Sequence, residues 1–339
     1  MSIKIKSLKI RNFRGIGELD LDFTDPDGKP LDLVVLAGPN GCGKTSVLEA
    51  ILIACGRKEM IAAASAENPQ CNVKDGAKNF EIEADALLEG QYVQFHWEIK
   101  IERNHRDRSV KPIISERVSY PIHLRNLRDD EMHIAYFSSW RGPKLVGALP
   151  ITAGRKGKRP AATDENRLWI IKQTLINEFA YSLFKGQIEL PLENEAIAKI
   201  QRLNSAWQIF YPAQRRELVI EPKSENSDEG FDLFMKVEGI RIPVDQLSSG
   251  EIEVLTMAGW FTMNDYRGGI VLIDEPELHM HVQWHRAIMR ALRVLLPETQ
   301  IIVATHSWDI LKSVMSYERF TLLREGDPRI AVDGKAVVR

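Results

Sequence analysis

The sequence has little of several features that would each point to a particular class of protein. Cysteine occurs only three times in 339 residues, at Cys42, Cys55 and Cys71. Their spacing contains no C-x-x-C pair, which argues against a zinc site or a disulfide framework and predicts free thiols in a reducing compartment. No uncharged stretch reaches about 18 residues, so we expect no membrane-spanning helix and no membrane partner. The first residues lack the apolar run of a signal peptide, which leaves the cytoplasm as the expected location.

A strong net charge is also missing. The chain has 45 Lys and Arg against 47 Asp and Glu, a formal net charge of −2, so no global field attracts nucleic acid. Contact with DNA would therefore need a local basic patch, and a solvated loop is the alternative for each basic stretch. The two candidate stretches are the loop with Arg155, Lys156, Lys158 and Arg159 and the arginines between 103 and 128.

Three of the 22 glycines, in contrast, lie close together in one short stretch. Residues 38–45 read Gly-Pro-Asn-Gly-Cys-Gly-Lys-Thr and fit G-x-x-x-x-G-K-[ST]. An apolar, strand-like run precedes this phosphate loop at 31–37 and a helical pattern follows it at 46–52, which is the context that phosphate binding requires. Backbone N–H groups and the helix N-terminus would face a polyphosphate, Lys44 would reach its β- and γ-phosphates, and Thr45 would ligate Mg²⁺. The predicted nucleotide-binding residues of this loop are Gly38, Asn40, Gly41, Gly43, Lys44, Thr45 and Ser46.

Two adjacent carboxylates end a second apolar run. Residues 270–273 are all apolar, which is typical of a parallel strand buried on both faces. Asp274 would meet Mg²⁺ beside the phosphate loop, and Glu275 would hold and polarise the attacking water. A strand end with two solvated acids is the alternative.

A third motif, the segment Leu-Ser-Ser-Gly-Glu at 247–251, precedes a helix that we expect to run to about 264. A helix N-terminus with serine and glycine is an anion site by geometry, although serine there is also an ordinary helix cap. The order of motifs favours the anion site, because Asp274 and Glu275 and then Thr305-His306-Ser307 follow at strand ends.

These motifs, together with Ile10-Arg11-Asn12-Phe13-Arg14-Gly15-Ile16, resemble ABC-type ATPases of the SMC/RecF/OLD-like branch. The stretch 275–281, Glu-Pro-Glu-Leu-His-Met-His, is most like the stand-alone AAA-family ATPase subunits of bacterial anti-phage systems of the Septu, PARIS or retron type. The resemblance covers about 1–56 and 231–315. It implies an α/β fold, an ABC-type P-loop NTPase with an N-terminal antiparallel β subdomain and a helical insertion that carries a short helical hairpin.

The resemblance also implies a division of one ATPase domain, 1–339, into three parts. Residues 1–150 would form an N-terminal lobe with Walker A, 151–220 the helical insertion, and 221–339 a C-terminal lobe with the signature, Walker B and the switch histidine. Within the insertion we expect helices at about 165–184 and 192–209. Other expected elements are strands at 3–10, 19–23, 134–137 and 300–304, hairpins at 80–101 and 231–244, and a helix at 284–296.

The resemblance assigns roles to the motif residues. Asp274 completes the metal site with Thr45, Glu275 is the catalytic base, and His306 senses the γ-phosphate. The signature residues Ser248, Ser249 and Gly250 would reach ATP held by a second copy. Two ATP molecules would then lie at the twofold interface of a homodimer, with a higher oligomer left open.

Several residues keep alternatives open. Arg14 would contact ATP or DNA, or lie on the surface. His279 and His281 have the i, i+2 spacing of a metal pair, but a helix or turn would splay them, so we expect a structural role at the dimer interface. We expect His96 to lie on a solvated face. The segment 247–251 has Ser-Ser-Gly-Glu where transporter subunits carry Ser-Gly-Gly-Gln, and none of Gln201, Gln208 and Gln214 is a clear Q-loop glutamine.

The expected function is an ATP-binding and ATP-hydrolysing dimerising switch that controls or scaffolds a separate effector, a nuclease, in anti-phage defence. Residues 307–339 lack the strand-linked carboxylate pair of a Toprim nuclease, so we expect any nuclease to be a partner. A RecF/SMC-like DNA repair ATPase that binds DNA is the alternative. A transporter nucleotide-binding subunit is a third and weaker one.

Overall fold

The computed structural model of the chain divides it into two compact units. Unit 1 comprises Met1–Phe137, Tyr266–Pro276 and Glu298–Arg339, and unit 2 comprises Ser138–Asp265 and Glu277–Pro297. The chain therefore passes between the units several times, and each unit is described separately below. The structure describes residues 2–61, 69–103, 110–119, 133–139, 166–186, 195–223, 230–264, 266–324, 326–329 and 337–338.

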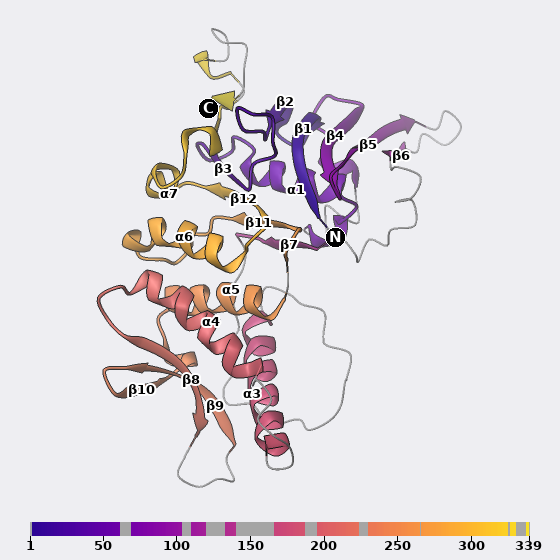
Figure 1. Ribbon diagram of the computed structural model, residues 1–339. Coiled ribbons are helices and arrows are strands. Elements are labelled where there is room, and N and C mark those ends of the chain that lie inside the picture. The colour runs from indigo at the N-terminus through magenta and orange to yellow at the C-terminus, as the bar shows by residue number, and fades with distance from the viewer. Residues whose placement is uncertain are drawn as a thin grey trace. The chain divides into compact units, whose positions relative to one another are not determined.

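Unit 1 contains an antiparallel sheet in the order β2-β1-β4-β5-β6 (Figure 1). This sheet confirms the expected N-terminal antiparallel β subdomain and the hairpin at 80–101. His96 lies on its partly exposed face, with Nε2 3.0 Å from Glu81 Oε1. The last strand was not expected, because its sequence lacks a clean apolar alternation. The strands are β1 (Ile3–Phe13), β2 (Ile16–Asp22), β4 (Asn79–Leu88), β5 (Gln91–Arg103) and β6 (Val110–Ser119).

The second sheet of unit 1 has the order β14-β13-β3-β12-β11-β7. Five of its strands run parallel, and β14 is antiparallel to β13. Every residue of β3, β11 and β12 is buried, as the apolar runs predicted for parallel strands covered on both faces. The strands are β3 (Leu33–Ala37), β7 (Ile134–Phe137), β11 (Ile270–Asp274), β12 (Gln300–Thr305), β13 (Arg319–Leu322) and β14 (Val337–Val338).

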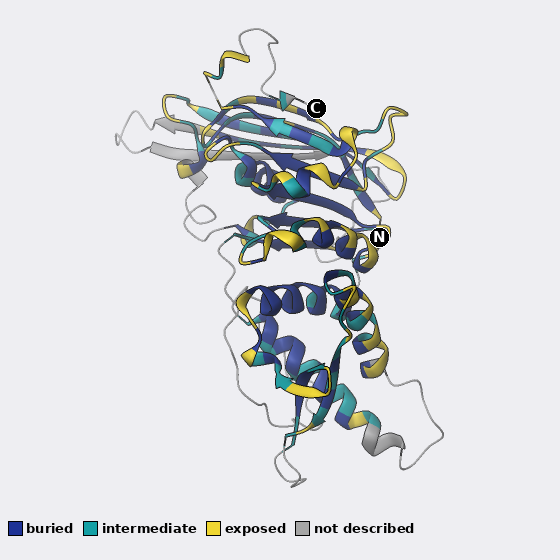
Figure 2. Ribbon diagram, turned by 90° about the vertical axis from the view of Figure 1, so that its left-hand side faces the viewer, coloured by how far each residue is buried: buried dark blue, intermediate teal, exposed yellow. Residues whose placement is uncertain are grey.

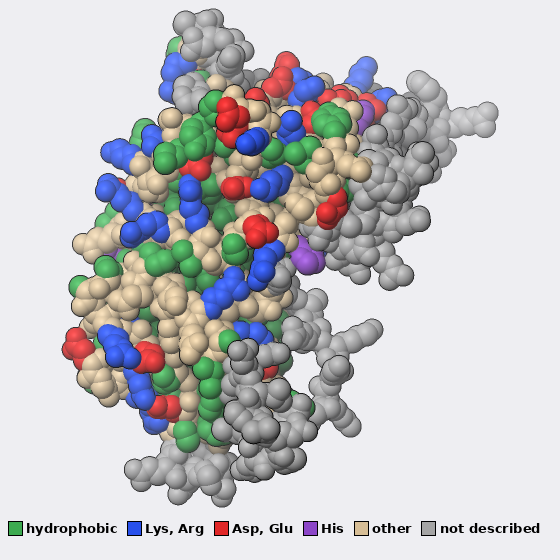
Figure 3. Space-filling model, in the orientation of Figure 1, with side chains coloured by type: hydrophobic (Ala, Val, Ile, Leu, Met, Phe, Trp, Pro, Cys, Tyr) green, Lys and Arg blue, Asp and Glu red, His purple; other side chains and the backbone are tan. Residues whose placement is uncertain are grey.

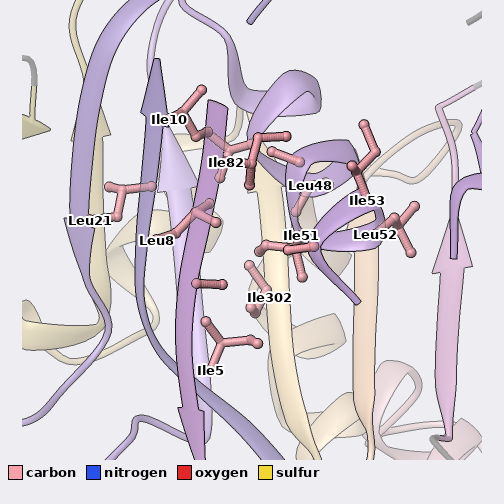
Figure 4. Close-up of a cluster of buried hydrophobic side chains, with 14 of the residues drawn as sticks. Ile5, Leu8, Ile10, Leu21, Leu48, Ile51, Leu52, Ile53, Ile82 and Ile302 are labelled. Atoms are coloured by element: carbon pink, nitrogen blue, oxygen red, sulfur yellow. The ribbon is translucent and has the colours of Figure 1, made fainter. Parts of the chain in front are cut away.

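Helix α1 (Lys44–Ala54) joins the two sheets of unit 1 into one core. Figure 4 shows Ile51 of this helix beside Ile302 of β12, with Ile82 of β4 in the same cluster. In the antiparallel sheet buried residues alternate with partly exposed ones along β1 and β4, seen as dark blue and teal in Figure 2, whereas β3, β11 and β12 are buried throughout. The phosphate loop is thereby anchored at both ends, by β3 and by α1. The short helices of the unit are η1 (Lys58–Met60), η2 (Pro69–Asn72), α7 (Trp308–Lys312) and η8 (Ser316–Glu318).

Unit 2 combines helices with a three-stranded antiparallel sheet in the order β10-β9-β8. Helices α3 and α4 confirm the expected helical hairpin, and β9 with β10 confirms the hairpin at 231–244. Strand β8 lies mostly within 151–220, where only helices were expected. The elements are α3 (Arg167–Gly186), α4 (Glu195–Phe210), β8 (Arg216–Pro222), β9 (Phe231–Val237), β10 (Ile240–Pro243), η6 (Val244–Gln246), α5 (Ser249–Met263), η7 (Val282–Trp284) and α6 (His285–Leu295).

A buried lysine connects three elements of unit 2. The side chain of Lys172 on α3 is 0% exposed and forms ion pairs with Asp232 of β9, at 3.1 Å, and with Asp245 of η6. A buried charge requires such partners, because moving one ion from water into a protein interior costs several kcal/mol, on the order of the desolvation penalty of a single ion. The triad therefore fixes η6, which immediately precedes the segment 247–251.

Charge and hydropathy agree with the sequence-based expectations at this level. On the face shown in Figure 3, the described Lys and Arg side chains are interspersed with Asp and Glu. Within the part of the chain that the structure describes, no helix is both long and apolar enough to cross a membrane. All three cysteines are free.

Candidate nucleotide-binding site

The strand order of the parallel sheet brings three predicted motifs of unit 1 to one edge. Strand β12 lies between β3 and β11, with Ala37 opposite Thr305 and Ala304 opposite Asp274. The carboxyl ends of parallel strands meet at the same edge, where ligands of open α/β sheets bind. The phosphate loop after β3, His306 after β12 and the Asp274–Glu275 pair at the end of β11 therefore lie together.

At two glycines of the phosphate loop there is no space for a side chain. Gly38 has φ +148°, and a Cβ there would lie 2.5 Å from the carbonyl oxygen of Leu322 and 2.7 Å from Cys42 Sγ. Gly43 has φ +97°, and its Cβ would lie 2.9 Å from Ile16. Glycines that cannot be replaced without a steric clash are typical of a loop whose backbone N–H groups surround a phosphate.

Lys44 directs its charge back over the loop. The residue is 6% exposed, and Nζ donates to the carbonyl oxygens of Gly38, at 3.0 Å, and of Pro39, at 3.2 Å. Nζ also lies 3.5 Å from His306 Nδ1. An ammonium carries three donors, so a Lys44 side chain held over the loop by these carbonyl oxygens can also donate to an anionic ligand there.

Thr45 and Asp274 supply a pair of oxygen ligands beside the loop. Thr45 Oγ1 donates to Asp274 Oδ2 at 2.7 Å, and Asp274 is 1% exposed. Mg²⁺ prefers oxygen ligands and usually takes one or two from protein together with phosphate oxygens. The donor set at this position therefore fits Mg²⁺ bound with a nucleotide.

His306 lies between the loop and Glu275. Its Nδ1 faces Lys44 Nζ, and its Nε2 lies 3.6 Å from Glu275 Oε1. Because the lysine can only donate, Nδ1 accepts in this arrangement and Nε2 carries the hydrogen toward the carboxylate. Glu275 itself has φ +51°, a conformation rare for a residue with a side chain and one that clusters at functional sites. Asp274 and Glu275 thus point to different partners, as expected.

Two features of this edge were missed from the sequence. Glu49 of α1 forms an ion pair with Arg14, and burial raises the pKa of its carboxyl, opposed by Arg14 and reinforced by the charge of Asp274. Arg14 also donates from Nε to Asn72 Oδ1 at 2.9 Å, so its side chain belongs to the packing around α1. Its contact with ATP or DNA stays a prediction.

Arg324 is the second missed residue. Its Nε donates to the carbonyl oxygen of Asn40 at 2.7 Å, so it supports the phosphate loop from outside. The residue follows β13 by two positions, and β13 pairs in parallel with β3. The stretch Phe320-Thr321-Leu322-Leu323 before Arg324 is rich in residues that favour strands and could have indicated a further strand end at this edge.

The signature segment 247–251 lies in unit 2, at the start of α5. Ser248 is the N-cap of α5 and forms a capping box with Glu251. Ser248 is therefore an ordinary helix cap, the alternative to an anion site. Ser249 is exposed. A Cβ on Gly250 would lie 2.6 Å from the carbonyl oxygen of His279, which explains the glycine. Nucleotide contact by Ser248, Ser249 and Gly250 stays a prediction.

Other candidate residues have local partners. His281 Nδ1 accepts from the backbone N–H of Gln283 at 3.3 Å. Among the described residues, the group with metal-ligand spacing is Glu81, Glu83 and His96, which does not include His279 or His281. Gln201 is exposed, and Gln208 and Gln214 bond to Tyr211 and Glu238, so no Q-loop residue is assigned. The loop 155–159 and the side chains of 103–128 lie outside the described residues.

The strand order, the glycine loop and the Asp274–Glu275 pair define an ABC-type P-loop ATPase fold. Two family models match the chain. One is described as "AAA domain, putative AbiEii toxin, Type IV TA system" and matches 181–311; the other is described as "AAA domain" and matches 7–140. A solved SMC head, bound to the C-winged helix domain of ScpA, has a TM-score of 0.56 at 14% identity and covers 94% of each chain, which is a likeness of fold.

Curated relatives define the family more closely. The "Retron Ec83 probable ATPase" of Escherichia coli is 33% identical over 407 residues, covering 96% of this chain and 72% of that protein. The "Septu protein PtuA" of Bacillus thuringiensis is 25% identical over 345 residues, covering 97% of this chain and 78% of that protein. The chain belongs to the family of SMC/RecF-like ATPases that includes these two proteins.

Proposed function

We propose that the protein is an ATP-hydrolysing switch that dimerises with ATP and controls a separate effector, a nuclease, in defence against phage. The observation that carries the ATPase proposal is the edge of the parallel sheet. There the Lys44 ammonium, the Thr45–Asp274 pair and the Glu275–His306 pair meet within hydrogen-bond or ion-pair reach. Phosphoryl transfer needs mainly such positioning and charge neutralisation from a protein.

Each side chain has a defined task in this proposal. The phosphate loop binds the nucleotide through backbone N–H groups, and Lys44 contacts its phosphates. Thr45 and Asp274 would hold Mg²⁺, which supplies charge neutralisation on the phosphates when bound. Glu275 orients the attacking water and accepts its proton. His306 connects Glu275 to the phosphate loop, because its Nε2 hydrogen faces the Glu275 carboxylate and its Nδ1 faces Lys44.

The dimer proposal rests on the exposed part of the signature. Ser249 is exposed at the N-terminus of α5, and a helix N-terminus favours phosphate. In the proposed dimer, Ser249 and Gly250 of each copy contact the nucleotide bound to the other copy. ATP then stabilises the dimer because it contacts both chains, and hydrolysis releases it.

The proposal of a defence role with an effector comes from the relatives. They are named as a Septu protein and a retron ATPase. Cells that carry the complete system should lose protection from phage when Lys44 is replaced by Ala, as measured by plating efficiency. Co-purification with the product of the neighbouring gene should identify the effector. Protection that is unchanged by Lys44→Ala would contradict the role of ATP in defence.

The dimer is tested with Glu275→Gln, which keeps the shape of the side chain and removes the base. With ATP and Mg²⁺ this variant should sediment as a stable dimer, and without nucleotide as a monomer. Glu298→Gln, on the exposed surface of the same unit, is the matched control and should dimerise only transiently. A monomeric Glu275→Gln chain at saturating ATP would overturn the dimer proposal, and full hydrolysis by Lys44→Ala would overturn the site.

A further inference from the structure

The carboxylate of Glu251 is surrounded by hydrogen-bond donors in unit 2. Glu251 is 8% exposed and accepts from the backbone N–H of Ser248 at 2.9 Å, from Ser248 Oγ at 2.7 Å and from the hydroxyl of Tyr211 at 2.7 Å. Arg216 forms an ion pair with the same carboxylate. Four donor groups from three residues therefore converge on the side chain that follows Gly250.

The two distant donors are themselves held in place. The guanidinium of Arg216 lies 3.7 Å from the centroid of the Tyr211 ring, and its Nε donates to Gln214 Oε1 at 2.9 Å. The Tyr211 ring stacks on Trp207, at 6.0 Å between centroids, and meets the edge of Trp284 at 5.2 Å. Packed aromatic rings leave little rotamer freedom, so the donors meet Glu251 in a fixed geometry.

Backbone of the segment around His279 also packs closely against the signature segment. The Cα of Gly250 faces the carbonyl group of His279 so closely that a Cβ would lie 2.6 Å from the oxygen. His279 has φ +63°. The start of α5 is thus constrained both by the Glu251 cluster and by this carbonyl group, and Ser249 is exposed.

We infer that Tyr211 and Arg216 are positioning residues that act through Glu251 to hold Ser249 and Gly250 ready for the nucleotide of a second copy. This inference rests on the proposed ATP-bound dimer. It also explains why glutamate stands at 251. Tyr211, Ser248 and Arg216 all donate to its carboxylate, and a glutamine would turn an NH₂ group, another donor, toward one of them.

The ionisation of Glu251 agrees with this geometry. Burial alone would raise the pKa of the carboxyl, but the hydrogen bonds from Tyr211 and Ser248 and the charge of Arg216 outweigh burial and lower it. The pKa of the Tyr211 hydroxyl is raised, first by burial and then by its bond to Glu251. Tyr211 therefore donates to an ionised partner, the stronger form of hydrogen bond.

The first experiment separates dimerisation from nucleotide binding. In a Glu275→Gln background, Glu251→Gln and Arg216→Met should each weaken ATP-dependent dimerisation by about tenfold, and Tyr211→Phe by about fivefold, as expected for lost charge-assisted hydrogen bonds. Sedimentation gives the dimer Kd. The affinity of the dilute single chain for a fluorescent ATP analogue should change by less than about twofold, because the phosphate loop supplies that contact.

Matched controls test whether the loss of a similar contact elsewhere has the same effect. Tyr92→Phe removes a tyrosine hydrogen bond to Asp85 in unit 1. Arg241→Met removes an arginine that lies 4.3 Å from the centroid of the Phe234 ring and pairs with Glu221 in unit 2. Both controls should dimerise like the background chain. Equal dimerisation of the Tyr211, Arg216 and Glu251 variants would overturn the inference while the dimer itself stands; a background chain that never dimerises would overturn the proposed function.

The second experiment tests whether a Glu251→Gln chain fails because its signature segment no longer completes the nucleotide site of the other copy. Neither Lys44→Ala chains nor Glu251→Gln chains should hydrolyse ATP well alone. Adding Lys44→Ala chains to Glu251→Gln chains creates one complete site per mixed dimer, so hydrolysis should rise at least about fivefold. Chains with both changes offer no intact signature and should give no rise. Absence of rescue by Lys44→Ala chains, or equal rescue by the doubly changed chains, would overturn the inference.

Discussion

Thr45 donates a hydrogen bond of 2.7 Å to Asp274, a residue 229 positions further along the chain. The hydroxyl belongs to the first turn of α1 and the carboxylate to the end of β11. Both are in unit 1, where β3, which leads into the phosphate loop, and β11 lie on either side of β12, the strand that leads to His306. This contact joins the phosphate loop to the Asp274–Glu275 pair and marks the position at which we propose that Mg²⁺ binds.

Loss of either oxygen should weaken the use of Mg²⁺. We predict that Thr45→Ala and Asp274→Asn each raise the Mg²⁺ concentration for half-maximal hydrolysis by about tenfold or more, because one of few protein ligands is lost. Binding of nucleotide without Mg²⁺ should be retained. Thr24→Ala, which removes a hydroxyl bonded at 2.7 Å to Asp22 in an exposed turn, is the control. An unchanged Mg²⁺ titration for Asp274→Asn would contradict the metal assignment.

A methyl group at Gly38 should disable the phosphate loop. The Cβ would lie 2.5 Å from the carbonyl oxygen of Leu322, so β13 or the loop must move. We predict loss of nucleotide binding by isothermal titration and a lower melting temperature. Gly28→Ala is matched because its φ is also positive, +77°, with nothing within 4 Å, and it should cost only about 1 kcal/mol of backbone strain. Equal effects of the two changes would refute the steric argument.

Removal of the buried Lys172 should destabilise the chain strongly. Lys172→Met leaves Asp232 and Asp245 without their shared cation, and breaking such a buried network costs about 3–5 kcal/mol. Lys199→Met removes a partly exposed pair with Glu178 and should cost less than about 1 kcal/mol. Urea unfolding measures both. The buried-charge account fails if the two variants unfold at the same urea concentration.

The Glu251 cluster should make stability depend on pH in acid. Its folded-state pKa is lowered from the ordinary value of 4.5. Stability from this group is therefore fully present above pH 4.5 and is lost as pH falls through the lowered pKa. The difference in unfolding free energy between the wild type and Glu251→Gln should shrink as the pH falls below 4.5 and through the lowered pKa of Glu251. Urea unfolding at a series of pH values would show this, and a constant difference would contradict it.

Much of the fold was predictable because the patterns are local. The alternation of Phe80, Ile82 and Ala84 gave the strand of a hairpin, and the glycine loop between an apolar run and a helical pattern gave the start of α1. Strands β6 and β8 were missed, since neither has a clear period-two pattern. Ser248 was predicted as a nucleotide contact, and its structural partner Glu251 could have been expected from the capping-box spacing.

The sequence by itself determined the chemistry of each motif: glycines that leave a bare loop, Lys44 and Thr45 after them, and carboxylates at the end of an apolar strand. Spacing along the chain contains this information because each motif is a local piece of backbone. Only the tertiary structure decided that β12 lies between β3 and β11, which puts His306 between Lys44 and Glu275. Sheet order depends on which strands pair across hundreds of residues, and no local pattern encodes that. The same holds for Tyr211 and Arg216, which lack any motif and reach Glu251 only through the packing of unit 2.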